Sequence, residues 1–335
     1  MWSTGAWRRA AQCPRTRVDM RVLVLLTAVV AAAAAAAAGA PPAHHDRRSL
    51  RSKLARVPAL QSPAGPVGPA PASSRVGIEG GKVAAVGQFP WMANIVMDDT
   101  WVCGGALISD KHILTAAQCA SGYARFLVTL GDVHTYQGSE SFAYAYTYKS
   151  CWHEDYEEET HLNDIGIIEL LYSVTFSENL RFVNLPSQSQ ASELFVGAAG
   201  TVSGFGMSET GFPSTDLLYA EQPILDNGLC ARYLGKYVKS TIICGDGEGG
   251  VGTCSGDAGD PLVITNSDDG NPMLVGISSF QSDVDCSLGY PSAYTRVPAY
   301  LDWIQKSTSE DWACYPGPTP APTPASSSPT PTPAP

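Results

Sequence analysis

Three short segments bring polar side chains together with cysteines and glycines in a way that points to chemistry. Residues 252–263 read GTCSGDAGDPLV with Ala258 at the centre, TAAQC contains Gln118, and NDIGIIEL contains Asp164. A carboxylate can orient a neighbouring proton donor. An amide, in contrast, has no nitrogen that titrates near neutral pH, and a methyl group cannot form a covalent intermediate. Of the three positions, only Asp164 keeps a side chain suited to proton chemistry.

Short strands must position these residues. From residue 75 onward, glycines and prolines separate apolar runs such as WMANIVM, FLVTL, IGIIELLY and MLVGISSF. Runs of about five to eight such residues between turn clusters are typical of β-strands. One helical pattern, PAYLDWIQKS, stands near the end and starts at Pro298. Its apolar face consists of Tyr300, Leu301, Trp303 and Ile304.

Five motifs in chain order resemble those of chymotrypsin- and trypsin-like serine proteases. IEGGKVAAVGQFPW resembles the start of a mature enzyme, and CGGALISDKHILTAAQC the strand and loop that carry its histidine. NDIGIIEL resembles the aspartate segment, TCSGDAGDPLV the nucleophile loop, and SAYTRVPAYLDWI the last strand and C-terminal helix. The resemblance runs from Ile78 to Trp303. It implies an all-β fold of two six-stranded antiparallel β-barrels with a C-terminal helix, and a site in the cleft between the barrels.

The resemblance also assigns the catalytic positions. In the family a serine attacks, a histidine takes its proton, and a buried aspartate holds the histidine. Here the histidine position is Gln118, the aspartate position is Asp164 and the serine position is Ala258. Either substitution alone should lower the rate by about six decades, so we expect no catalysis. The oxyanion-hole positions, Gly256 and Ala258, keep their backbone N–H groups, and Asp260 replaces a glycine beside the site.

No other side chain is expected to replace the missing groups. His112 lies at the other end of the strand before Gln118, and Ser255 should be aimed away from the site. The resemblance places none of the remaining histidines in the cleft. Asp164 is then expected to be a buried carboxylate that accepts backbone hydrogen bonds and one from Gln118. The remaining histidines are His44, His45, His134, His153 and His161.

The specificity pocket implied by the resemblance also departs from the family pattern. Its base is Gly252 instead of the aspartate of trypsin-like enzymes, and its wall reads Ser279-Phe280-Gln281. Gln281 and Ser292 replace glycines that let a substrate side chain pass. We expect a narrowed cleft; the alternative is that loops shift to accommodate these residues.

Activation departs from the pattern as well. Family zymogens are cut after Arg or Lys, and the new amine pairs with the aspartate before the serine. Ile78 matches that N-terminus and Asp257 that aspartate, but Gly77 precedes Ile78. A cut after Arg75 would leave two extra residues and displace the amine. Either the ion pair is not used, or another protease trims the chain.

The N-terminal residues, basic up to Arg21 and then uncharged over 22–38, predict an export signal. Together with that signal, the nine cysteines indicate disulfides instead of metal sites. Each bridge could contribute about 3 kcal/mol by restricting the unfolded chain. Whether Cys151 pairs with Cys314 is left open, and Cys13 lies in the leader. The resemblance implies the pairs Cys103–Cys119, Cys230–Cys244 and Cys254–Cys286.

A calcium site is the one cofactor hypothesis. Asp132 and Glu140 bracket a loop at the place where many family members bind calcium. Calcium takes six or more oxygen ligands, and only these two carboxylates can be named. The sequence therefore predicts no cofactor, with calcium as the alternative.

Four segments follow from composition and the resemblance. Residues 1–40 form a leader with basic residues up to Arg21 and an uncharged run over 22–38, and the chain has an alternative start at Met20. A retained signal anchor is the alternative to cleavage. Residues 41–77 are a disordered pro-segment, 78–313 the protease-like domain, and 314–335 a Pro/Thr/Ser-rich tail.

The distribution of charge indicates which classes of binding partner to expect. Residues 1–77 hold 11 of the 21 Lys and Arg but 2 of the 32 acids, so the remainder carries a formal charge of −20. Such a field disfavours nucleic acid and anionic membranes and favours cationic partners, although solubility alone would also explain it.

The function that the resemblance implies is binding. We expect a secreted, extracellular, monomeric and non-catalytic serine protease homologue, not an enzyme. Its partner would be a protein such as a protease, a zymogen or a protease inhibitor. The alternatives are a residual serine-type endopeptidase with unconventional catalytic residues, and a storage or structural protein.

Overall fold

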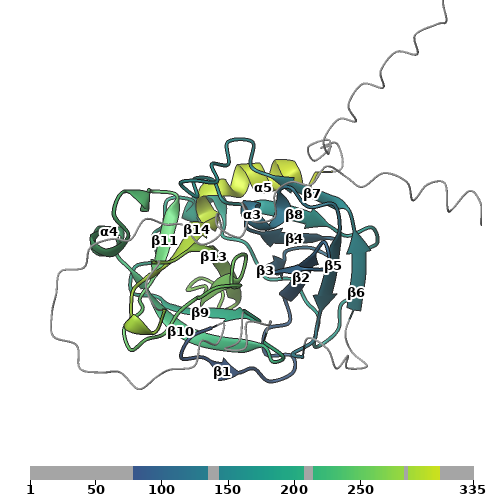
Figure 1. Cartoon of the computed structure of the whole chain (residues 1–335), viewed down its shortest axis with the longest axis horizontal. Coiled ribbons are helices and arrows are strands. Elements are labelled where there is room, and N and C mark those ends of the chain that lie inside the picture. Colours follow the sequence, from purple (N-terminus) through teal and green to yellow (C-terminus); the bar gives the residue numbers. More distant parts are fainter. Residues whose placement is uncertain (1–77, 135–142, 207–213, 283–285, 310–335) are drawn as a thin grey trace, which may run out of the picture. The chain divides into compact units, whose positions relative to one another are not determined.

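The computed structural model describes residues 78–134, 143–206, 214–282 and 286–309, all of them in the second of the chain's two units. The predicted leader, pro-segment and Pro-rich tail lie outside the described residues. The described part consists of two antiparallel β-sheets with few helices, as predicted (Figure 1). Within it, every helix is too short or too polar to cross a membrane.

The first sheet has the strand order β6-β5-β2-β3-β4-β8-β7. One bent segment supplies both of its edges, because β6 pairs with β5 before Tyr148 and β7 pairs with β8 after it. When this bent pair is counted as one strand, the sheet has the six strands that were predicted and forms a half-barrel. The strands are β2 (Met92–Met97), β3 (Trp101–Leu107), β4 (His112–Thr115), β5 (Phe126–Leu130), β6 (Ala143–Thr147), β7 (Lys149–Trp152) and β8 (Gly166–Glu169).

The second sheet closes on itself. Its order is β1-β10-β11-β14-β13-β12-β9, and β9 also pairs with β10, which completes a ring of six strands with β1 added outside. The strands are β1 (Lys82–Val83), β9 (Ala199–Gly204), β10 (Leu218–Leu225), β11 (Ile242–Gly245), β12 (Pro261–Thr265), β13 (Pro272–Phe280) and β14 (Ser292–Arg296).

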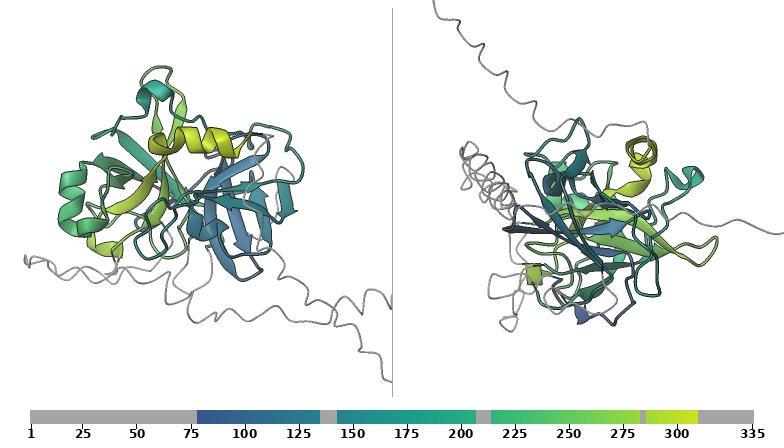
Figure 2. Two further views of the ribbon diagram at one scale, coloured as in Figure 1. Left: turned by 90° about the horizontal axis from the view of Figure 1, so that it is seen from above. Right: turned by 90° about the vertical axis from the view of Figure 1, so that its right-hand side faces the viewer.

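Within the described ranges, three short α-helices accompany the sheets: α3 (Ala117–Ala120), α4 (Asn227–Leu234) and α5 (Leu301–Ser307). The predicted C-terminal helix is α5 with a preceding 3-10 turn over Val297–Tyr300. Leu301 and Ile304 are buried, and Ile304 shares one hydrophobic cluster with both sheets. Figure 2 shows α5 lying across the junction of the sheets. Further 3-10 turns are Gln188–Gln190, Gly235–Tyr237 and Cys286–Leu288.

Disulfides brace the loops around the sheets. Cys151 on β7 is disulfide-bonded, and Cys314, its candidate partner, lies outside the described residues, as does Cys13. The three bridges between described residues are Cys103–Cys119, Cys230–Cys244 and Cys254–Cys286, the same pairs that the resemblance implies.

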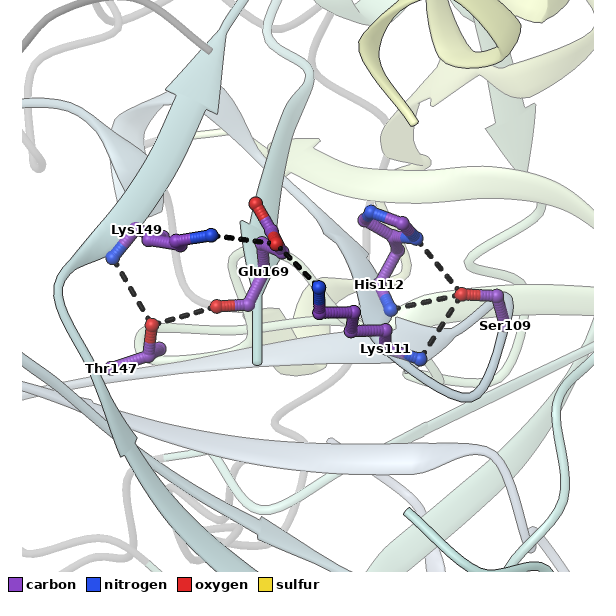
Figure 3. A network of polar contacts seen from close by, with 6 residues as sticks. All are labelled: Ser109, Lys111, His112, Thr147, Lys149 and Glu169. Atoms are coloured by element: carbon purple, nitrogen blue, oxygen red, sulfur yellow. Dashed lines mark hydrogen bonds and ion pairs between the residues drawn. The ribbon is translucent and has the colours of Figure 1, made fainter. Parts of the chain in front are cut away.

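A polar network lies where β4, β7 and β8 meet (Figure 3). Lys111 and Lys149 both bind Glu169 Oε1, at 2.9 and 2.8 Å. Ser109 Oγ accepts the N–H groups of Lys111 and His112. Burial alone would raise the pKa of Glu169, but the two lysines outweigh it, so this pKa lies below its ordinary value.

Replacing Glu169 with glutamine is expected to lower the free energy of unfolding at pH 7 by about 1 kcal/mol, because both ion pairs are partly exposed. The lowered pKa means that the contribution is present above the unfolded pKa of about 4.3 and is lost as pH falls through the folded value. Denaturant melts from pH 7 to 3 would measure it, with the exposed Glu248→Gln as control. A difference that grows on acidification would contradict this account.

Candidate functional site

The fold brings Gln118 and Asp164 into direct contact. Gln118 lies in α3, directly after β4, and Asp164 lies just before β8, the strand that pairs with β4. The Gln118 backbone N–H donates to Asp164 Oδ1 at 3.0 Å, and its side-chain Nε2 donates to Asp164 Oδ2 at 2.6 Å. This paired contact is what the sequence predicted for a carboxylate beside an amide.

The Asp164 carboxylate is fully buried and well satisfied. Ser279 Oγ donates to its Oδ2 at 2.7 Å, and Gln118 Nε2 also donates to the Ser279 carbonyl at 2.9 Å. Burial raises the pKa of Asp164, although nearby His161 and the hydrogen bonds from Ser279 and Gln118 favour the charged form. Both N–H bonds of the Gln118 amide are thus used, and only its carbonyl oxygen is left for other contacts. This group has no nitrogen that could take a proton.

Ala258 lies in the turn before β12, half-buried, with its carbonyl accepting the Gly104 N–H at 2.9 Å. Gly256 and Gly259 have φ values of 91° and 87°, in the region that favours glycine. Among the described residues, none accepts a hydrogen bond from the N–H of Gly256 or Ala258. Both donors therefore remain available to an oxyanion, whereas the methyl group offers no nucleophile.

Two of the predicted pocket positions, Gly252 and Ser292, lie side by side. Thr253 N–H donates to Ser292 Oγ at 3.0 Å, and a Cβ on Gly252 would lie 2.6 Å from that oxygen. Phe280 is buried and Gln281 is half-buried. Ser292 Oγ thus lies directly beside Gly252, the predicted base, while the narrowed cleft itself stays a prediction.

Only some of the residues that the resemblance implies in activation are among the described residues. Ile78 is fully buried in the core of the second barrel. Glu79 and Gly252 exchange backbone hydrogen bonds of 2.8 and 3.2 Å, which anchor this segment beside the pocket. Asp257 is buried in the Ala258 turn. Arg75 and Gly77 lie outside the described residues.

One histidine near Asp164, His161, was not expected at the site from the sequence. His161 is 7% exposed, stacks on Phe280 with ring centroids 5.4 Å apart, and acts electrostatically on Asp164. The expectation that no remaining histidine lies at the site was therefore wrong for His161. The available signal was its position three residues before Asp164. His112 starts β4, and burial lowers its pKa; Ser255 is exposed.

The calcium hypothesis gains no support from the described part. Asp132 Oδ1 accepts the N–H groups of Val133 and His134, so it caps its own turn. Glu140 lies outside the described residues. Within the described ranges, no group of three or more His, Cys, Asp or Glu side chains could hold a metal ion.

Comparison with known proteins decides the family. The family model described as trypsin matches residues 78–304. The chain belongs to the trypsin family. At 35% identity over 235 residues it is similar to a collagenase from Hypoderma lineatum, with 68% of this chain and 86% of that protein covered. Brachyurin from Leptuca pugilator is 36% identical over 233 residues, covering 69% and 98%.

A mouse relative and a solved structure support the same family assignment. Chymotrypsin-C from Mus musculus is 34% identical over 264 residues, covering 76% of this chain and 96% of that protein. The structure of HL collagenase matches with a TM-score of 0.62 and 34% identity, covering 69% and 98%. These relatives carry the names of proteolytic enzymes, and this trypsin-family chain shares their chymotrypsin-like double barrel.

Proposed function

We propose that this trypsin-family chain does not cleave peptides and instead binds a protein partner. The observation that carries the proposal is the contact between Gln118 and Asp164, because it puts an amide where a proton-accepting imidazole would be held. Ala258 adds a methyl group in the turn that would present a nucleophile. A site without base or nucleophile retains only oxyanion donors and binding surface.

The partner is a protein that recognises the former substrate face, such as a protease, a zymogen or a protease inhibitor. The charge of −20 beyond residue 77 favours a basic surface on that partner. Disulfides are typical of oxidising compartments, which supports secretion. The chain acts as a monomer without a cofactor.

Hydrolysis of a mixed peptide library by the purified full chain tests the loss of catalysis. We expect no turnover and no covalent adduct with a serine-directed phosphonate, while chymotrypsin-C run in parallel shows both. Turnover that survives repurification would overturn the proposal. His161 is the one observation that favours the alternative peptidase, because it places an imidazole beside Asp164. Residual turnover that His161→Gln abolishes would assign the activity to it.

Binding is tested separately with two matched variants. Ser255→Trp adds bulk on the exposed side of the Ala258 turn, and Ser267→Trp adds the same bulk after the other end of β12. The affinity of the natural chain and of each variant for the protein partner would be measured by calorimetry. We expect Ser255→Trp to weaken binding at least about tenfold and Ser267→Trp to leave it unchanged. Equal effects would place the interface elsewhere.

A further inference from the structure

Three tyrosines are exposed at the edge of the first sheet. Tyr144, Tyr146 and Tyr148 are 64%, 58% and 69% exposed. β6, the strand that carries the first two, pairs only with β5 among the described residues. Side chains alternate along a strand, and the intervening Ala143 and Ala145 pack against the core. The rings of Tyr144 and Tyr146 therefore lie on the outer face, and Tyr148 continues the alternation directly after β6.

Apolar side chains extend this outer face onto the neighbouring strands. Leu127 on β5 is opposite Tyr146, Val96 on β2 is opposite Leu127, and both are half-buried. The strands β2, β5 and β6 contain no Asp, Glu, Lys or Arg. We call Tyr144, Tyr146, Tyr148, Leu127 and Val96 the tyrosine face. A charged partner would find no counter-charge on these strands, so the tyrosine face fits an uncharged, apolar occupant.

The chain itself carries a segment of this chemistry, outside the described residues. Residues 315–335 contain nine prolines and no charged residue, and every second residue over 316–324 is proline. Such a sequence favours the extended polyproline II helix, which is largely preformed and so loses little conformational entropy when it binds. Aromatic surfaces bind polyproline II segments in other proteins, because the rings offer flat apolar area while the tyrosine hydroxyl stays in water.

The spacing of tyrosines and prolines is compatible with such a contact. Alternate residues of a strand are about 6.8 Å apart, and alternate residues of a polyproline II helix are about 6.2 Å apart. The three tyrosines span about 14 Å, which about five residues of the tail would cover. Because this helix has about three residues per turn, prolines at every second position appear on all of its sides. Any side that turns to the sheet therefore presents prolines to the tyrosines.

Contacts of α5 place the start of the tail near β7. The Trp303 ring stacks on His153 with ring centroids 5.6 Å apart, and Trp303 Nε1 donates to Glu154 Oε2 at 3.1 Å. His153 and Glu154 directly follow β7. The described chain ends at Ser309, and residues 310–314 can extend at most about 17 Å from it. The tail therefore starts close to the strand that continues β6.

A disulfide can fix this start. Cys151 on β7 is disulfide-bonded, and the six other described cysteines pair among themselves, so its partner within the chain is Cys13 or Cys314. Cys13 precedes the uncharged run of the predicted leader and would be removed with it. Cys314 comes two residues before Pro316, and Cys151 comes three residues after Tyr148. A bridge between Cys151 and Cys314 would thus start the tail about 10 Å from the tyrosine face.

We propose that a Cys151–Cys314 disulfide holds the tail from Tyr315 onward, and that the tail packs as a polyproline II helix on the tyrosine face of the same chain. The tether raises the effective concentration of the tail to about the millimolar range, so weak packing is sufficient. The proposal goes beyond protein binding at the Ala258 turn, because the tyrosine face belongs to the first sheet and Ala258 precedes a strand of the second.

Tyrosine nitration of the full chain tests the packing. After brief treatment with tetranitromethane, peptide mass spectrometry would give the nitration rate of each tyrosine. Replacing the five prolines of 316–324 with serine should raise the rates of Tyr146 and Tyr148 at least about threefold, because the tail leaves the rings. The control replaces the four prolines of 329–335 with serine and should leave these rates unchanged. Tyr172, which is 84% exposed, should react equally in every variant.

Proteolysis of the tail tests the same contact from the other side. A proline-specific endopeptidase would be added to the full chain, and the loss of mass from the tail would be followed over time. Tyr146→Ser combined with Tyr148→Ser should speed cleavage at least about threefold, whereas Tyr172→Ser should leave it unchanged. If the double variant fails to fold, the proline variants still decide. Peptide mapping without reduction should find Cys151 joined to Cys314.

Three results would overturn the proposal. The first is nitration and cleavage rates that do not respond to these replacements. The second is a bridge from Cys151 to Cys13. The third is protection that rises with protein concentration between about 1 and 100 µM, which would assign the tyrosine face to the tail of a second copy. These readouts measure neither hydrolysis by this chain nor binding at the Ala258 turn, so their failure is distinguishable from failure of the proposed function.

Discussion

Replacing Gln118 with histidine and Ala258 with serine in one chain is expected to create peptidase activity that neither replacement creates alone. The rest of the apparatus is in place: Asp164 already accepts hydrogen bonds from residue 118 and from Ser279, and the oxyanion donors are available. Catalytic side chains act as a unit, and a triad that lacks one member loses most of its rate. The double variant should therefore exceed each single variant by at least about 10³-fold.

Initial rates on a small activated ester would measure this gain, because such a substrate depends little on the pocket around Ser292. A third replacement, Asp164→Asn, in the double variant should remove about 10⁴-fold of the restored rate by favouring the wrong histidine tautomer. If the single and double variants hydrolyse the ester equally, the assignment of these three positions is wrong. Rates that rise on the ester but not on peptides would locate the remaining block in the pocket.

Removing the Asp164 side chain is expected to destabilise the natural protein strongly. Asp164→Ala leaves the Gln118 backbone N–H, the Gln118 amide and the Ser279 hydroxyl without their acceptor in a buried site. Unsatisfied buried donors lower the free energy of unfolding by about 1–3 kcal/mol each, and partial rearrangement limits the sum to about 3 kcal/mol.

Chemical denaturation at pH 7 measures this loss. The exposed Asp268→Ala, an identical replacement on a surface loop, should change stability by less than about 0.5 kcal/mol. Equal effects of the two replacements would show that Asp164 has no structural role. A large effect confined to Asp164 would show that this carboxylate has a structural role, whatever its part in chemistry.

Local sequence determined the chemical capacity of the site and the type of its elements. No fold can make the Gln118 amide a base near neutral pH or the Ala258 methyl a nucleophile, because these properties belong to the side chains. Short apolar runs between glycine and proline clusters predicted strands such as β5 and β13, and the helical spacing near the end predicted α5. Such periodicity reports which residues face the core, and it extends over neighbouring residues only.

The tertiary structure alone decided which groups meet across the sheets. Gln118 contacts the Ser279 carbonyl across 161 residues of chain, and Ser279 reaches Asp164 across 115. These pairs form because the strands close around two barrels, and no periodicity encodes that closure. For the same reason the sequence did not place His161 beside Asp164, and it did not reveal that the Asp260 carboxyl lies between two glycines from different barrels.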